Sequence, residues 1–170
     1  MNNETLTENI QLLLDIEAIK KLKARYCKYA DSGENPNEFT HLFTENAVLD
    51  ESDDGVFCGR DNILDMYKKI APLFKLNQHL VLSPIIDIDG KKATGEWRLL
   101  QLCTTSHPEG DKAFWACGYY KERYVKVDSQ WYFEHVEARV HFCCDYDDGW
   151  AKAPFVELLS AEAMSALGLT

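Results

Sequence analysis

The side chains best suited to acid–base chemistry at neutral pH are five histidines: His41, His79, His107, His135 and His141. An imidazole titrates close to physiological pH, so histidine is the residue type used most often as a general base. We expect His41 to face solvent on a short helix, and His107 lies beside Pro108 in a turn. His79 opens a strand expected over residues 78–89. A single histidine is more often a hydrogen-bonded core or surface residue than a catalytic base, so His79 needs independent support.

The last expected strand, residues 130–145, carries two further histidines and an arginine. Strict alternation along a strand places His135, His141 and Arg139 on one side. Both sides of this strand are apolar, however, and a β-bulge near residues 134–137 could reset the alternation. Which of these side chains reaches a pocket stays open at this level. An unpaired charge in mid-strand is unfavourable, so Arg139 needs either a ligand or a neighbouring carboxylate.

Several functional classes are not expected. The formal charge is −10, from 18 basic and 28 acidic residues, whereas nucleic acids and anionic membranes bind basic surfaces. No glycine-rich loop joins a strand to a helix, and neither GxSxG nor HExxH occurs. The potential metal ligands of the last strand lack compact spacing; they are His135, His141, Glu137 and Asp145. We therefore expect no nucleotide cofactor and no metal.

The sequence also suggests a cellular compartment. Residues 1–8 are polar and lack the apolar core of a signal peptide. No apolar run approaches the roughly 18 residues that a membrane span needs. The six cysteines form no CxxC motif or regular framework, so we expect free thiols in a reducing compartment. These features together favour the cytoplasm.

The first half of the chain predicts three helices. The longest covers residues 7–31, and its apolar residues have the three-and-four spacing of one buried stripe; they are Ile10, Leu13, Leu14, Ile19, Leu22 and Tyr26. Gly33 can adopt the left-handed conformation that ends a helix. Pro36 suits the first turn of a short helix over residues 36–43. The third helix is expected over residues 62–74.

The second half of the chain is rich in strand-forming residues. Two short strands, 47–49 and 56–58, precede the third helix, and four long strands follow it, separated by turn-forming residues. The long strands cover residues 78–89, 93–106, 112–127 and 130–145. Three helices with a curved antiparallel sheet of six strands define an α+β fold. We expect one domain over residues 1–150, followed by a tail over 151–170, in which a helix is possible, that caps the sheet or contacts another subunit.

This order of elements resembles the cone of the nuclear-transport-factor superfamily, and short motifs resemble its SnoaL-like branch. The motifs are the helix segment Asp15-Ile16-Glu17-Ala18-Ile19-Lys20, the junction Phe57-Cys58-Gly59-Arg60, and the hairpin Gly118-Tyr119-Tyr120 with Asp128-Ser129-Gln130-Trp131. In amino-acid sequence these motifs are most similar to those of bile-acid 7α-dehydratases, and less similar to those of scytalone dehydratase and hexachlorocyclohexane dehydrochlorinase. The resemblance covers residues 10–145 and implies a cystatin-like α+β barrel. Its concave sheet face, closed at the narrow end by the first helix, would hold a hydrophobic small molecule.

The resemblance implies four catalytic residues. His79 would be the general base, Asp31 would orient it, Tyr26 would protonate the leaving group or polarise a carbonyl, and Arg139 would hold an anionic oxygen. Tyr26 and Asp31 are five residues apart, about 140° around an ideal helix, so we expect the helix to unwind before Asp31. Packing for Tyr26 and helix termination for Asp31 are the structural alternatives.

One position departs from the bile-acid dehydratase pattern. Those enzymes carry an aspartate four residues after the tryptophan of the fourth strand, whereas Trp97 is followed at that spacing by Gln101. An amide can hold a ligand, here as an added donor, but it cannot exchange a proton. The other expected ligand-contacting residues are aromatic or imidazole side chains, for which core packing is the alternative; they are Trp97, Tyr120, Tyr67, Trp115 and His135.

The function expected from these residues is cofactor-independent dehydration of a hydrophobic, hydroxylated carbonyl compound such as a steroid or a polyketide. Three alternatives stay open: an isomerase similar to ketosteroid isomerase, a non-catalytic ligand-binding module, and an accessory subunit whose open cone face is covered by a partner. Relatives suggest a homodimer or a homotrimer.

Overall fold

The computed structural model describes residues 3–52, 55–159 and 165. Its elements follow the predicted order of helices and strands. They are α1 (Asn3–Ser32), α2 (Pro36–Thr40), β1 (Phe43–Asp50), β2 (Val56–Cys58), α3 (Arg60–Ile70), a single 3-10 turn (Ala71–Leu73), β3 (Phe74–Asp89), β4 (Lys92–His107), β5 (Gly110–Val127) and β6 (Gln130–Asp145).

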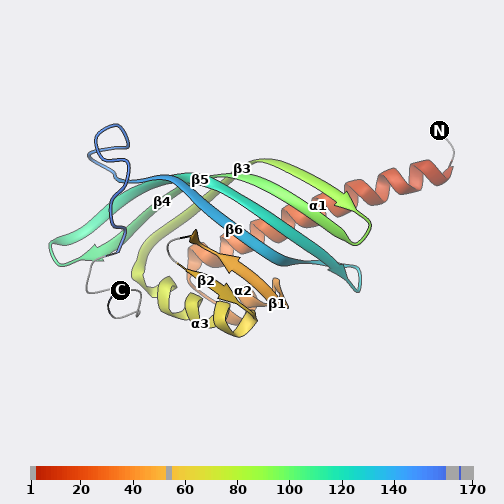
Figure 1. Cartoon of the computed structure of the whole chain (residues 1–170), viewed down its shortest axis with the longest axis horizontal. Coiled ribbons are helices and arrows are strands. Elements are labelled where there is room, and N and C mark those ends of the chain that lie inside the picture. The colour runs from red at the N-terminus through yellow and green to blue at the C-terminus, as the bar shows by residue number, and fades with distance from the viewer. Residues whose placement is uncertain (1–2, 53–54, 160–164, 166–170) are drawn as a thin grey trace.

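The strands form one six-stranded sheet in the order β2-β1-β6-β5-β4-β3. Neighbouring strands are antiparallel except β1 and β6, which run parallel. The four long strands arch across the molecule, with α3, β1 and β2 beneath them and α1 running along the sheet and beyond it (Figure 1). The predicted α+β class with a curved sheet is confirmed. None of the described helices has the length and hydropathy of a membrane span.

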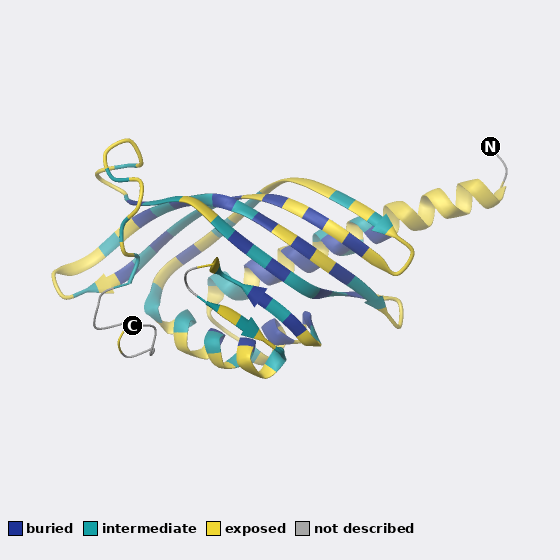
Figure 2. Cartoon of the chain, viewed as in Figure 1, coloured by how far each residue is buried: buried dark blue, intermediate teal, exposed yellow. Residues whose placement is uncertain are grey.

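Helix α1 packs on the sheet over only part of its length. Ile19, Leu22 and Tyr26 are buried in the core, whereas Ile10 and Leu13 are 48% and 62% exposed. The first turns of α1 project past the sheet, where they are coloured as exposed (Figure 2). The predicted single buried stripe is therefore wrong for its first half, because apolar spacing does not reveal where the sheet beneath a helix ends. Gly33 ends the helix with φ of 65°, as expected.

Two β-bulges divide strand β6. Arg123 of β5 pairs with His135 while Tyr124 pairs with Phe133, so one residue of β6, Glu134, is extra. The predicted bulge near 134–137 is thus confirmed. A second register shift follows, since Cys117 pairs with Phe142 and Gly118 with Val140.

Gly118 allows the close approach of the strands at this second bulge. A Cβ atom at position 118 would lie 2.0 Å from the carbonyl oxygen of Arg139. Each one-residue shift moves the following side chains of β6 to the other face of the sheet.

The segment after β6 returns to the sheet. The Cys143 backbone N–H donates to the Pro154 carbonyl at 2.9 Å, and the Val156 N–H donates to the Cys143 carbonyl at 2.9 Å. The Thr105 hydroxyl donates to the Leu158 carbonyl at 2.8 Å. These bonds hold residues 154–159 against the mouth of the cone as irregular chain. The rest of the possible tail helix falls mainly on residues outside the described ones.

Candidate functional site

A cavity of about 470 Å³ lies between the concave face of the sheet and helices α1 and α3. One row across the sheet at this cavity consists of His79, Gln101, Ala116 and Cys143, which are paired strand to strand. Alanines at positions 30, 116 and 138 also line it. Small side chains leave space that larger ones would fill, so these alanines help to form the cavity.

His79 lines this cavity, and two hydrogen bonds to Asp31 fix its position. The Asp31 carboxylate oxygen Oδ1 lies 2.5 Å from His79 Nδ1 and also accepts the His79 backbone N–H at 3.0 Å. An ionised carboxylate only accepts hydrogen bonds, so Nδ1 carries the proton and Nε2 carries the free lone pair. The His79 side chain is 10% exposed. The arrangement presents one imidazole nitrogen as a base to whatever occupies the cavity.

Asp31 reaches His79 without any unwinding of the helix. Helix α1 stays α-helical through Ser32, so the expected break before Asp31 is wrong. Tyr26 lines the cavity, whereas Asp31 approaches the imidazole of β3 on its other ring nitrogen. The two side chains do not need to point in the same direction, because Tyr26 faces the cavity directly whereas Asp31 acts through His79.

Two buried tyrosines form the deep end of the cavity. The rings of Tyr26 and Tyr120 lie 6.0 Å apart, centroid to centroid, and both line the hollow. Burial raises the pKa of both phenols well above the ordinary value of 10.0. Both hydroxyls therefore stay protonated at neutral pH, as hydrogen-bond donors to a ligand oxygen require.

A fully buried ion pair packs against the rings of these two tyrosines. Lys23 Nζ lies 2.6 Å from Glu122 Oε1, and neither side chain is exposed to solvent. The same ammonium lies 3.2 Å from the ring centroid of Tyr120 and 4.3 Å from that of Tyr26. Tyr124 donates a hydrogen bond to the Glu122 carboxylate. The sequence analysis did not predict this buried ion pair. The available signal was that Lys23 and Glu122 occupy positions at which the apolar periodicity of their helix and strand predicts buried residues.

Tyr67 and Gln101 also line the cavity, as expected. Burial raises the pKa of Tyr67 to about 12, and its hydroxyl donates to the Tyr29 carbonyl at 2.5 Å. The Gln101 amide donates to Asn77 Oδ1 at 2.7 Å. Asn77, which the sequence analysis missed, is buried and lines the same cavity.

Besides Asp31, which acts through His79, four expected site residues do not line the cavity. Arg139 and His135 follow the bulge at Glu134, which turns them to the outer face, whereas Ala138 and Val140 line the hollow. Trp115 also points outward and stacks on Tyr146 at 6.1 Å.

Trp97 faces inward but lies deeper than the cavity, in the core. Its indole nitrogen donates to the Tyr124 hydroxyl at 3.0 Å. The placements expected for Arg139, His135, Trp115 and Trp97 at the ligand are thus corrected.

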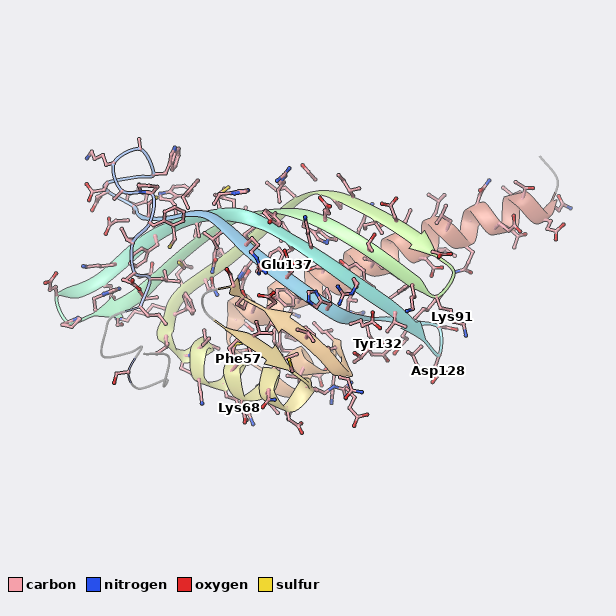
Figure 3. All side chains as sticks on the ribbon, in the orientation of Figure 1. Phe57, Lys68, Lys91, Asp128, Tyr132 and Glu137 are labelled. Carbon is pink, nitrogen blue, oxygen red and sulfur yellow. The ribbon has the colours of Figure 1, made fainter. Side chains whose placement is uncertain are left out.

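Arg139 has a structural partner instead of a ligand. Its guanidinium donates to both carboxylate oxygens of Asp50, at 2.9 and 2.8 Å. Glu137, labelled on β6 in Figure 3, lies 3.7 Å from the same guanidinium. The hydrogen bonds from Arg139 lower the pKa of Asp50 below its ordinary 3.8.

Arg139→Met is expected to destabilise the fold by about 1 kcal/mol at neutral pH. A lowered folded-state pKa makes the contribution of Asp50 complete above its unfolded pKa and lost as the pH falls through the folded one. The difference in melting temperature from wild type should therefore be largest near neutral pH and shrink as the pH falls below the ordinary pKa of Asp50, 3.8. The control is Arg123→Met, whose exposed pair with Glu134 spans 3.9 Å. A pH-independent difference would contradict this account.

The described residues include no cluster of three or more histidine, cysteine or carboxylate side chains arranged to hold a metal ion. All six cysteines are free thiols.

The C-terminal segment forms a further wall of the cavity, which residues 155–159 line. The site that the structure brings together is therefore one histidine–carboxylate pair, two amides and two deep tyrosines. The rest of the cavity is lined by apolar side chains together with Glu51, Ser52, Tyr67 and Glu157.

The sequence matches a known protein family over most of its length. The model of the SnoaL-like domain matches residues 11–137. The chain belongs to the SnoaL-like family. The match runs from α1 to the first half of β6, so it ends before the C-terminal segment and before the β6 residues that line the cavity, which are Ala138, Val140 and Cys143.

Solved structures similar to this SnoaL-like protein share its fold. A candidate scytalone dehydratase from Novosphingobium aromaticivorans is 24% identical, with a TM-score of 0.73 over 81% of this chain and 91% of that one. The hexachlorocyclohexane dehydrochlorinase LinA-type3 from Novosphingobium barchaimii is 17% identical, with a TM-score of 0.72 over 81% and 93%. A protein of unknown function with a cystatin-like fold from Nostoc punctiforme is 20% identical, with a TM-score of 0.62 over 75% and 91%.

Proposed function

We propose that this SnoaL-like protein is a cofactor-independent dehydratase acting on a hydrophobic, hydroxylated carbonyl compound such as a steroid or a polyketide. The observation that carries the proposal is the His79 imidazole, held at 2.5 Å by Asp31 at the wall of a cavity of about 470 Å³. A base of this kind suits removal of a proton next to a carbonyl group.

The surrounding residues support each step of an elimination. Nε2 of His79 takes the proton, and the negative charge of Asp31 stabilises the imidazolium that forms. The hydroxyls of Tyr26 and Tyr120 donate hydrogen bonds to the carbonyl oxygen and to the departing hydroxyl. A tyrosine gives its proton to that hydroxyl, which leaves as water, and the imidazolium of His79 returns a proton to the phenolate, so that one proton passes from carbon to water overall.

A turnover screen tests the proposal. Purified protein is incubated, without added cofactor, with a panel of hydroxylated steroid and polyketide carbonyls, and the products are analysed by mass spectrometry. The expected product is lighter than its substrate by one water molecule. A rearranged product of unchanged mass would favour the isomerase alternative, and binding without any product would favour the ligand-binding module.

A further inference from the structure

The two amides beside His79 have a determined orientation. Asn77 Nδ2 lies 3.4 Å from the Ala30 carbonyl oxygen, and a carbonyl oxygen can only accept. The NH₂ group of Asn77 must therefore face Ala30, which leaves Oδ1 facing Gln101. That oxygen accepts the Gln101 NH₂ group at 2.7 Å. The main chain of α1 thus fixes the direction of both amides.

This orientation engages one N–H of the Gln101 amide and leaves its carbonyl oxygen, Oε1, as an acceptor for a ligand. Gln101 lines the cavity and is paired across the strands with His79, so the two side chains are neighbours on one face of the sheet. No described residue is seen to donate a hydrogen bond to Oε1. An acceptor at the cavity wall favours a ligand that brings a donor and disfavours one that brings another acceptor.

An acceptor beside the base also restricts where the leaving group can lie. Negative charge builds on the departing oxygen during elimination, and an acceptor next to that oxygen would oppose the reaction. The departing hydroxyl therefore belongs on the side of Tyr26 and Tyr120, which donate. The donor that meets Gln101 must be a different group, one that the substrate keeps.

We propose that Gln101 is a specificity-determining residue that accepts a hydrogen bond from a retained hydroxyl group of the substrate, close to the carbon that His79 deprotonates. This inference rests on the proposed function and narrows its substrate class to compounds with a second hydroxyl besides the one that leaves. It gives Gln101 an acceptor role beside the donor role expected from the resemblance, since one N–H of its NH₂ group is engaged by Asn77.

Binding of two matched ligands tests this assignment without any need for turnover. 2-Naphthol carries a hydroxyl donor, whereas 2-methoxynaphthalene has nearly the same shape and no donor. Wild-type protein is expected to bind 2-naphthol about tenfold more tightly in calorimetric titration. Gln101→Met should remove this preference, mainly by weakening the binding of 2-naphthol.

Two further variants separate Gln101 from its neighbours. Asn77→Leu frees the Gln101 amide to turn, so the preference should shrink although Gln101 is unchanged. His79→Ala should keep the preference, because the hydroxyl is assigned to Gln101.

Three results would overturn the proposal. They are equal or undetectable binding of the two ligands by wild type, an unchanged preference in Gln101→Met, or a preference lost in His79→Ala. If a variant fails to fold, the relative binding of 2-naphthol and 2-methoxynaphthalene to wild-type protein still tests the proposal. Failure of the turnover screen alone would leave the hydroxyl preference standing, so the two proposals can fail separately.

Discussion

Replacing His79 with alanine is expected to lower the rate of water loss by about 10²–10⁴-fold, the range that a positioned general base contributes. His79 is the one histidine among the described residues that line the cavity, and Nε2 is the ring nitrogen left to act as a base, since Nδ1 is engaged by Asp31 at 2.5 Å. Alanine leaves space but no base. The measurement is kcat on the substrate identified by the screen, together with the melting temperature, which should change little.

Two comparisons make this prediction specific. Asp31→Asn should also lower kcat steeply, because an amide can accept the same hydrogen bonds but supplies no charge to stabilise the imidazolium. His141→Ala is the matched control, since His141 is exposed on β6 and contacts Tyr119 at 5.4 Å outside the cavity. Unchanged turnover in His79→Ala would refute the catalytic role.

Replacing Lys23 with methionine is expected to reduce the free energy of unfolding by about 3–5 kcal/mol. Methionine has a similar length but leaves the Glu122 carboxylate buried without its ammonium partner at 2.6 Å. The uncompensated charge causes most of the loss, together with the cation–π contact that lies 3.2 Å from the Tyr120 centroid. Equilibrium denaturation by urea measures the change.

The double variant Lys23→Met/Glu122→Gln separates the two causes. The neutral amide that replaces the Glu122 carboxylate keeps a hydrogen-bonding group for Tyr124 and removes the unpaired charge, so most of the lost stability should return. Lys20→Met is the control on the same helix, because its pair with Glu17 is largely exposed; a change within about 0.5 kcal/mol is expected there. If Lys23→Met cost no more than Lys20→Met, the buried pair would be energetically unimportant.

Local pattern alone was enough to predict the elements and the family. The helix over 7–31, the turn residues between long strands, and the short motifs around positions 57–60 and 118–131 all act within a few residues of chain. Periodicity and turn chemistry are local properties, so they can be read without coordinates. The same holds for His79, Asp31 and Tyr26 as candidates, since the resemblance assigns them by position along the chain.

The tertiary structure decided which candidates meet. Glu134 adds one residue to β6, and that shift turns Arg139 and His135 from the cavity to the outer face. A bulge depends on how two strands pair, so the sequence of one strand suggests it without placing it. The buried pair of Lys23 and Glu122 joins residues 99 positions apart, and Asn77 fixes Gln101 only because α1 lies behind it. Contacts between distant segments depend on packing in three dimensions, and that packing determined the chemistry of this cavity.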